Sequence, residues 1–306
     1  MSELVLDSVQ LKAVLDESVW TERERRHAER VDRFVEPHLR RARRGEAHPV
    51  WDFLFSYYSL KPRQLRRWHP GYGVVLDGAS ACRFRERSGY GTLGSAVTVT
   101  HEHLLARIET VEFIAELLHA TARRPARLNC FGLHEWAMVY RTADIRHEVP
   151  LRLGAAATDA VVDSMPLRCS HFDAYRFFTE PAAPRNAEKL SRQSQVATEQ
   201  PGCVHANMDL YKFCGKLGPL VESGLLMDCL DLAADARELD MRASPYDLTG
   251  YGFEPIAIET SAGRAEYVRA QQDVADRAAP LRAALADRCD LLLSTVNRES
   301  GSVRGT

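Results

Sequence analysis

The chain has 306 residues, a net charge of −2, 27% charged residues and 45% hydrophobic residues. This is the composition of an ordinary globular protein, and the near-neutral charge argues against a general coat for duplex DNA. There is no run of about 18 apolar residues and no cationic-then-apolar leader pattern, so we expect a cytoplasmic protein without a membrane span. The seven cysteines occur singly and without a CxxC pair, which favours reduced thiols over a cysteine-based zinc site.

The first hundred residues predict a helix, an aromatic segment and a small sheet, in that order. Thr21–Glu24 has the spacing of a capping box and predicts the start of a helix that Gly45 would end. Residues 48–68 are apolar and aromatic and predict a second helical segment. Between 70 and 100, six glycines alternate with short β-branched runs, which predicts a hairpin or small sheet.

The rest of the chain predicts mostly helices. Thr100 should cap a helix whose apolar residues have helical spacing. Periodicity does not decide whether the aromatic segments 128–141 and 167–178 are strands or helices. Beyond a surface loop at 181–200, we expect helices over 205–217, from Ser223 and over 264–294, and a strand at 255–259. We therefore expect a mainly α protein with minor β structure (α+β): a single compact helical domain over 1–294, followed by a flexible C-terminal tail at 295–306.

Three segments in the middle of the chain place histidines beside carboxylates in apolar and aromatic surroundings. Ionisable groups in such surroundings are costly to desolvate unless they are paired or used. The sequence therefore predicts a functional site built from these six residues: His134, Glu135, His171, Asp173, His205 and Asp209.

The segment 205–217 gives the most specific expectation. His205 and Asp209 are four residues apart, so they share one helix face, and Lys212 continues that face. Asp209 is our first candidate for a carboxylate that activates water, and Lys212 for a group that holds an anion. His205 and Asp209 could also both ligate a metal. The plainer interpretation is an exposed helix face with ordinary ion pairs.

The other two segments leave similar alternatives. On a strand, His171 and Asp173 would share a face. Asp173 is the second candidate for a carboxylate that activates water. His171 or His205 would orient that carboxylate or protonate a base. The alternative is a core histidine that Asp173 satisfies. Adjacent residues point in different directions, so we expect only one of His134 and Glu135 to face a cleft, with Glu135 a candidate general acid.

A basic and aromatic stretch is the third feature. Between Pro37 and Pro70 there are eight Lys and Arg residues against two carboxylates, interleaved with aromatic residues. This composition is typical of surfaces that hold a phosphate and a base, although a solvated helix face has it too. The candidate phosphate ligands are Arg66, Arg67, Lys212 and Arg242. Asp240 or Asp247 could orient Arg242, and Tyr246 is a candidate substrate contact in the same stretch. The candidate stacking residues are Trp136, Phe172 and Tyr175, with Tyr211 close to Lys212.

Five strings carry a resemblance to a known family: HPVWDFLFSYY at 48–58, RRWHPG at 66–71, FGLHEWAM at 131–138, QPGCVHANMDLYK at 200–212 and LDMRASPYD at 239–247. They resemble those of an actinobacterial family labelled 3-methyladenine DNA glycosylase, over roughly residues 20–285. The resemblance implies cleavage of a nucleobase N-glycosidic bond.

These observations lead to one expected function and two alternatives. The expected function is hydrolysis of an N-glycosidic bond in a nucleotide or nucleic acid, with a carboxylate stabilising an oxocarbenium-like transition state and no cofactor. The first alternative is a helical non-haem iron enzyme acting on a small molecule. Its iron ligands would come from the six residues of the three His/carboxylate segments. The second alternative is a nucleic-acid-binding protein without catalysis.

Overall fold

The computed structural model describes residues 13–58, 60–144 and 149–302. In chain order the first half contains β1 (Ala13–Leu15), α1 (Glu17–Arg43), α2 (Phe53–Ser56), α3 (Pro62–Leu65), β2 (Val74–Leu76), the 3-10 helix η1 (Ala79–Phe84), β3 (Tyr90–Leu93), β4 (Ala96–Val99), α4 (His101–Leu105), α5 (Ile108–Ala122) and α6 (Leu133–Ala137). The second half contains α7 (Gly154–Ser164), α8 (Phe172–Tyr175), η2 (Ala183–Arg185), α9 (Gln195–Thr198), α10 (Val204–Leu217), η3 (Gly218–Leu220), α11 (Ser223–Arg242), η4 (Thr249–Tyr251) and α12 (Ser261–Ser302).

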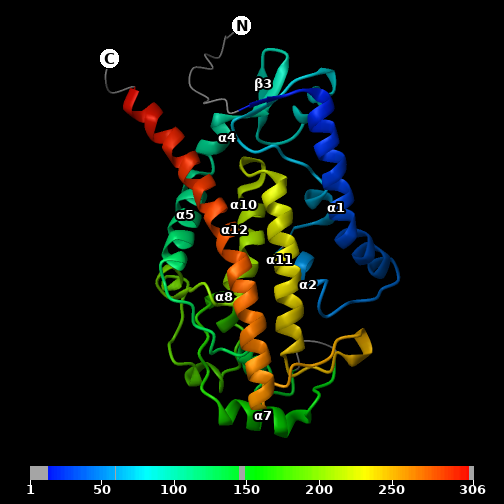
Figure 1. Ribbon diagram of the computed structural model, residues 1–306, viewed down its shortest axis with the longest axis vertical. Coiled ribbons are helices and arrows are strands. Elements are labelled where there is room, and N and C mark those ends of the chain that lie inside the picture. Colours follow the sequence, from blue (N-terminus) through cyan, green and yellow to red (C-terminus); the bar gives the residue numbers. More distant parts are fainter. Residues whose placement is uncertain (1–12, 59, 145–148, 303–306) are drawn as a thin grey trace.

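The helix α10 lies in the centre of an elongated molecule (Figure 1). It packs against α11 and α12, and α12 also packs along α5. The small sheet lies at the end of the molecule where α12 finishes, and α7 lies at the opposite end (Figure 1). The fold is therefore mainly α with minor β structure, as the sequence predicts, and a continuous apolar core runs from α1 to α12.

The sheet has four strands in the order β1-β2-β4-β3. Strand β1 pairs parallel to β2, and the other two pairings are antiparallel. The small sheet predicted between 70 and 100 is thus confirmed, with β1 added at its edge. Helix α1 is fixed to this sheet by Trp20, whose Nε1 donates a hydrogen bond of 2.8 Å to the carbonyl oxygen of Asp77.

Two N-terminal expectations differ from the structure. Helix α1 begins at Glu17, one turn before the predicted capping box, and the Thr21 hydroxyl donates to the Glu17 carbonyl instead of capping a helix start. The described residues of the segment 48–68 form two single-turn helices, α2 and α3, in place of one long helix. One reason is local: the Asp52 carboxylate accepts the backbone N–H of His48, which bends the chain before α2.

Two C-terminal expectations also differ. Residues 255–259 form no strand; Ile256 and Ile258 are buried, but no described strand lies beside them. Of the tail predicted at 295–306, residues 295–302 are the last part of α12, which continues through Pro280 to Ser302, and residues 303–306 lie outside the described residues. Leu293 and Val296 pack against the core, so the helix continues to bury apolar surface there.

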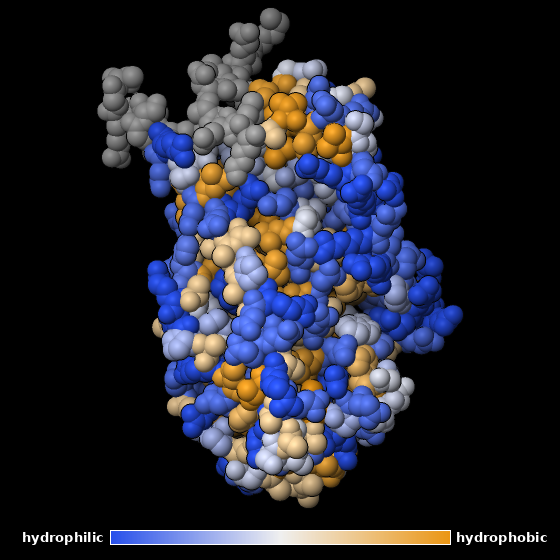
Figure 2. All heavy atoms as spheres, in the orientation of Figure 1, coloured by the Kyte–Doolittle hydropathy of each residue, from blue (hydrophilic) through white to orange (hydrophobic). Residues whose placement is uncertain are grey.

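Hydrophilic residues cover much of the face shown in Figure 2, including the flank formed by α1. Among the described residues, no helix combines the length and the apolar character that crossing a membrane requires.

Candidate metal centre

The single-turn helix α6 carries two predicted site residues into the interior. Phe131 and Gly132 have φ angles of 53° and 72°, so the chain turns sharply just before α6. A Cβ on Gly132 would lie 3.1 Å from the Cβ of Ala243, so glycine allows this turn to approach the end of α11 closely. As a result, His134 and Glu135 are both buried.

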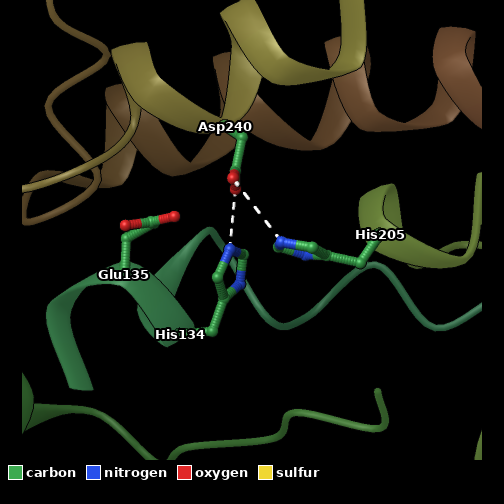
Figure 3. Close-up of side chains that lie close together, drawn as sticks. All are labelled: His134, Glu135, His205 and Asp240. Carbon is green, nitrogen blue, oxygen red and sulfur yellow. Dashed lines mark ion pairs between the residues drawn. The ribbon is translucent and has the colours of Figure 1, made fainter. Parts of the chain in front are cut away.

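Four buried residues, His134, Glu135, His205 and Asp240, form a group that we call the central cluster. One nitrogen or oxygen atom of each lies within 4.8 Å of the others, and they come from α6, α10 and α11 (Figure 3). His134 Nε2 is 2.7 Å from Asp240 Oδ1, and His205 Nε2 is 3.8 Å from Asp240 Oδ2. His134 and Glu135 both reach partners on α11, but only His134 lines the small cavity at the cluster, which agrees with the expectation that one of the two faces a cleft.

The polar atoms of the central cluster are close together without being hydrogen-bonded to one another. His134 Nε2 and Asp240 Oδ1 are 2.7 Å apart, yet neither has a hydrogen-bond partner among the described residues. Glu135 Oε2 and His205 Nδ1 also lack one in this part of the chain. Buried polar atoms nearly always have partners, so four such atoms in one place indicate a site for a further group. Metal ligands have this geometry, because their lone pairs point at the ion and not at each other.

Arg237 compensates part of the negative charge of the central cluster. Its Nη1 lies 3.1 Å from both Glu135 Oε1 and Asp240 Oδ2, and the residue is only 1% exposed. Its guanidinium also packs on the Phe53 ring and donates to the Pro49 carbonyl. One arginine therefore faces both buried carboxylates.

The charges of the central cluster shift the pKa values of its members. Burial opposes the ionisation of Asp240, but His134, His205 and Arg237 outweigh it and hold the pKa of Asp240 below its usual range. Burial alone would lower the pKa of His134, yet the Asp240 carboxylate raises it well above its ordinary value. Burial and the neighbouring His134 lower the pKa of His205, which is therefore neutral with a lone pair to donate.

A second buried group lies directly beside the first. We call His171, Glu199 and Asp209 the flanking cluster. His171 Nε2 lies 3.4 Å from Glu199 Oε1 and 3.4 Å from Asp209 Oδ2. The imidazole of His171 stacks against that of His205, with ring centroids 5.4 Å apart, so the two clusters are neighbours. The segments 167–178 and 205–217 therefore converge, as expected.

A chain of ion pairs leads from the flanking cluster to the surface. Lys212 Nζ lies 2.6 Å from Asp209 Oδ2 and 2.8 Å from Asp173 Oδ2, and Asp173 pairs with the half-exposed Arg192 at 2.6 Å. Burial opposes the charge of Asp209, but Lys212 and His171 hold its pKa below its usual range. Asp173 thus pairs with cations and not with His171, and the His205–Asp209 face of α10 is buried and not exposed. The residues around His171 form the short helix α8, so the shared strand face is also absent.

The aromatic residues predicted to stack on a substrate belong mostly to the core. Trp136, Tyr211 and Tyr246 are fully buried. Phe172 and Tyr175 are partly buried and pack around a small apolar group near Met138. Packing in the core is therefore enough to explain why these segments are aromatic, without a bound ligand.

The basic residues predicted to bind phosphate are partly neutralised by carboxylates. Arg66 pairs with Asp32 at 2.7 Å and with Glu36, both on α1. Arg242 donates to the Glu254 carbonyl at 3.0 Å, whereas Arg67 is exposed. The basic stretch is therefore less positive in the fold than its sequence suggests.

Sequence reasoning missed two residues of the clusters, and also the arginine that pairs with the central one. Asp240 was considered only as a partner for Arg242, and Glu199 and Arg237 were not considered at all. A signal existed for two of them: Arg237 and Asp240 are three residues apart on a helix face shared with buried alanines. Glu199 gave no signal, because it lies at the end of a polar stretch that reads as a loop.

A small cavity reaches the central cluster. It has a volume of about 10 Å³ and is lined by His134 and His205 together with Cys130, Cys169 and Cys203. This is room for one water molecule. A larger cavity of about 560 Å³ lies between α1 and α11, and its lining contains no residue of either cluster.

Comparison of this chain with known protein families, with curated proteins and with solved structures gave no match.

Proposed function

We propose that this protein is a metal-dependent enzyme whose ion is held by His134, Glu135, His205 and Asp240. The observation that carries this proposal is the convergence of four buried ligand residues, each with one ligand atom within 4.8 Å of the others, in a group that also contains unpartnered polar atoms. An ion among these atoms would satisfy them together. Binding would also displace the proton that the raised pKa of His134 holds on its ring.

The donor atoms favour iron(II) among the common metals. Two imidazoles with carboxylates are typical of non-haem iron(II) sites, whereas structural zinc sites are usually rich in cysteine. The four donors come from three separate helices, and Arg237 forms ion pairs with both carboxylates. The same donor set also binds manganese and zinc, so the test compares all three.

The chain's own residues suggest what the reaction involves. His205 is neutral and available as a ligand. The cavity beside His134 and His205 has room for one water-sized molecule, which supports water or dioxygen as the species that meets the ion. The ion would supply Lewis-acid or redox chemistry at that position.

Metal analysis of protein purified without an affinity tag tests the proposal. We expect iron at about one equivalent or more, removable by a chelator and restored by anaerobic iron(II). His205→Gln and Asp240→Asn should lose it. His27→Gln is the matched control, because His27 is also a buried histidine, but its Nε2 donates to the carbonyl oxygen of Leu65 and it belongs to neither cluster. Wild-type protein that binds no iron, manganese or zinc after reconstitution would exclude this function.

Catalysis itself needs a second measurement. In the presence of a reductant, iron-loaded wild-type protein should consume dioxygen. The iron-loaded control His27→Gln should do so at a similar rate, and His205→Gln should lose this reaction. Equal rates in wild type and His205→Gln would leave a metal-binding protein without the proposed catalysis.

Hydrolysis of a nucleobase N-glycosidic bond stays a prediction from the sequence. It needs a carboxylate that accepts a proton, and the lowered pKa of Asp209 makes that carboxylate a weak base. Release of base from alkylated DNA by metal-free protein, lost in Asp209→Asn, is the result that would favour it over the metal-dependent function.

A further inference from the structure

We propose that a cavity between α1 and the first turn of α11 binds a small molecule that carries a phosphate monoester on an apolar group. The cavity has a volume of about 320 Å³, within the range of about 300–1,000 Å³ that is typical of small-molecule pockets. It lies at the opposite end of α11 from Asp240, about 24 Å along the helix axis. The proposal therefore goes beyond the proposed function and does not depend on the metal centre.

Three arginines on one face of α1 form the rim of this cavity: Arg23, Arg26 and Arg30. Their spacing of three and four residues places them on successive turns of the same face. Arg23 and Arg26 are exposed and Arg30 is half-buried, so the guanidinium groups lie where the cavity meets solvent. Arginine is the side chain best suited to bind phosphate, because its N–H groups form a planar fork.

Two of these arginines keep most of their N–H groups available for a ligand. Within the described residues, Arg23 forms no side-chain hydrogen bond or ion pair, and Arg26 pairs with Glu22 through Nε alone. Glu22 does not line the cavity. Both Nη atoms of Arg26 and the whole guanidinium group of Arg23 are therefore free to donate to an anion.

The third arginine is paired on one side only. Arg30 pairs with Asp228 and Asp231 through Nη2, which leaves its Nε and Nη1 without a described partner. Among the described lining residues the only carboxylate is Glu222, and it pairs with Arg288. The carboxylates near the rim thus leave several arginine donors that a phosphate group would use.

The first turn of α11 adds backbone donors opposite the arginines. Ser223 is fixed by two hydrogen bonds: its Oγ accepts from the His69 backbone N–H at 2.8 Å, and its own N–H donates to the His69 carbonyl at 3.0 Å. The next N–H groups, of Gly224 and Leu225, have no acceptor in the described part of the chain. Gly224 lines the cavity, and a Cβ there would meet nothing within 4 Å.

His27 brings an unpartnered buried atom to the same cavity. The residue is only 6% exposed and lines the cavity. Its Nε2 lies 2.8 Å from the carbonyl oxygen of Leu65, which can only accept, so Nε2 carries the proton and Nδ1 has a lone pair. Burial lowers the pKa of His27, so the ring is neutral. Nδ1 has no partner among the described residues, and the O–H of a singly protonated phosphate would supply one.

The floor of the cavity is apolar and explains why the ligand is an ester. It is formed by Trp68, Pro70 and Met227, all of which are buried. An inorganic anion would leave this apolar surface in contact with water, whereas an attached apolar group would cover it. The cavity therefore combines cationic and backbone donors at its rim with an apolar floor, as a phosphate monoester requires.

The competing arrangement is a cavity that holds only water. In it, the arginines serve the surface ion pairs of α1 and α11 and nothing more. The two arrangements differ in whether the protein binds a phosphate ester at all.

Calorimetric titration of the full-length protein in the presence of a chelator decides between them. The probes are phenyl phosphate, inorganic phosphate and phenol. Phenyl phosphate should bind with one molecule per chain, inorganic phosphate more weakly, and phenol not at all. The affinity for phenyl phosphate should fall as salt is added, because the rim charges are near the surface. No binding of phenyl phosphate, or inorganic phosphate binding as tightly as the ester, would overturn the proposal.

Three arginine variants locate the site. Arg23→Gln should weaken phenyl phosphate binding by about tenfold or more, because hydrogen bonds to a charged group are lost. Arg25→Gln is the matched control, since Arg25 lies on α1 but pairs with Glu22 and Glu29 and does not line the cavity. Arg33→Gln tests the larger cavity that Arg33 lines. An equal loss in Arg23→Gln and Arg25→Gln, or a loss in Arg33→Gln alone, would overturn the assignment.

A pair of variants at Gly224 separates binding from folding. Gly224→Asp places a carboxylate in the first turn of α11, where acidic residues stabilise a helix but repel a bound anion. Gly224→Asn has nearly the same shape without the charge. Thermal unfolding should show Gly224→Asp to be at least as stable as Gly224→Asn, yet it should bind phenyl phosphate at least tenfold more weakly. Equal affinities in the two variants would contradict a phosphate group at this end of α11.

Discussion

Trp136 Nε1 donates a hydrogen bond of 2.8 Å to the carbonyl oxygen of Ala243, and this bond fixes α6 to the end of α11. Trp136 follows Glu135 directly, and Ala243 lies three residues after Asp240. The bond therefore sets the distance between two elements that carry ligands of the central cluster, without taking part in the cluster itself.

Replacing Trp136 by Phe should weaken metal binding. The variant loses the hydrogen bond and part of the packing, so α6 is held less firmly, and supporting residues of metal sites typically contribute about 10–100-fold in affinity. Trp20→Phe is the matched control, because Trp20 Nε1 donates a bond of the same 2.8 Å length near the sheet. Both variants should lose stability, but only Trp136→Phe should lose metal affinity. Equal affinities would contradict the positioning role of Trp136.

Asp240→Asn should destabilise the metal-free protein by about 3 kcal/mol, because it leaves His134 without a buried counter-charge and removes one of the two carboxylates that face Arg237. Asp231→Asn on the same helix is the control; Asp231 is about one-third exposed and pairs with Arg30 near the surface, so its loss should cost less than about 1 kcal/mol. Urea unfolding of both variants in a chelator gives the two values. Similar values would mean that the central cluster contributes no more than a surface ion pair.

Two glycines should respond in opposite ways to substitution by alanine. A Cβ on Gly263 would lie 2.0 Å from the carbonyl oxygen of Ala257, so Gly263→Ala must displace the backbone and should cost about 1–3 kcal/mol. Gly224 lies in α11 with nothing within 4 Å of the added atom, so Gly224→Ala should raise stability by about 0.5 kcal/mol. Thermal unfolding of both variants under identical conditions is the measurement; a stable Gly263→Ala would show that the start of α12 is loosely packed.

His69 should make the fold sensitive to acid. Burial, helped by the charge of Arg87, lowers the pKa of His69 to about 3, and its Nδ1 lies 2.8 Å from the Tyr90 hydroxyl. The unfolded chain protonates His69 near pH 6.5, so the unfolded state gains protons first as the pH falls. The stability contribution is complete above about pH 6.5. It is lost below that pH by about 1.4 kcal/mol per unit, down to about pH 3.

The variant His69→Gln isolates this effect. The difference in the free energy of unfolding between wild type and His69→Gln should shrink as the pH falls from 7 to 5. A difference that stays constant over this range would show that the imidazole is protonated as easily in the fold as outside it.

The sequence predicted helices and the sheet best where residues close together in the chain determine the structure by themselves. Thr100 caps α4 and accepts a hydrogen bond from the His103 backbone N–H, as its position before an apolar repeat predicts, although the single helix expected from there is divided into α4 and α5. The capping pattern at Thr21 failed because the helix already begins at Glu17, and the added turn buries Trp20 against the sheet. Ile256 and Ile258 alternate like a strand, but the structure provides no neighbouring strand for them.

The site could be predicted only in part, for a physical reason. His134, His205, His171 and Asp209 were recognisable because an ionisable group among aromatic residues signals burial. Which residues meet was not recognisable, because that depends on how α6, α10 and α11 cross. Asp240 shows the limit: it is fully buried, yet its neighbours in sequence, including Glu238 and Arg242, suggest an ordinary charged helix end.

The three segments that carry the central cluster also lie far apart along the chain. About 70 residues separate His134 from His205, and about 35 separate His205 from Asp240. Contacts among these residues close two long loops of the chain, one between His134 and His205 and one between His205 and Asp240. The entropy cost of closing a loop grows only slowly with its length. An ion joining these segments would therefore act like a cross-link on the unfolded chain, and the order in which α6, α10 and α11 dock would set the folding rate. Folding and metal loading of this protein should then be measured as one process.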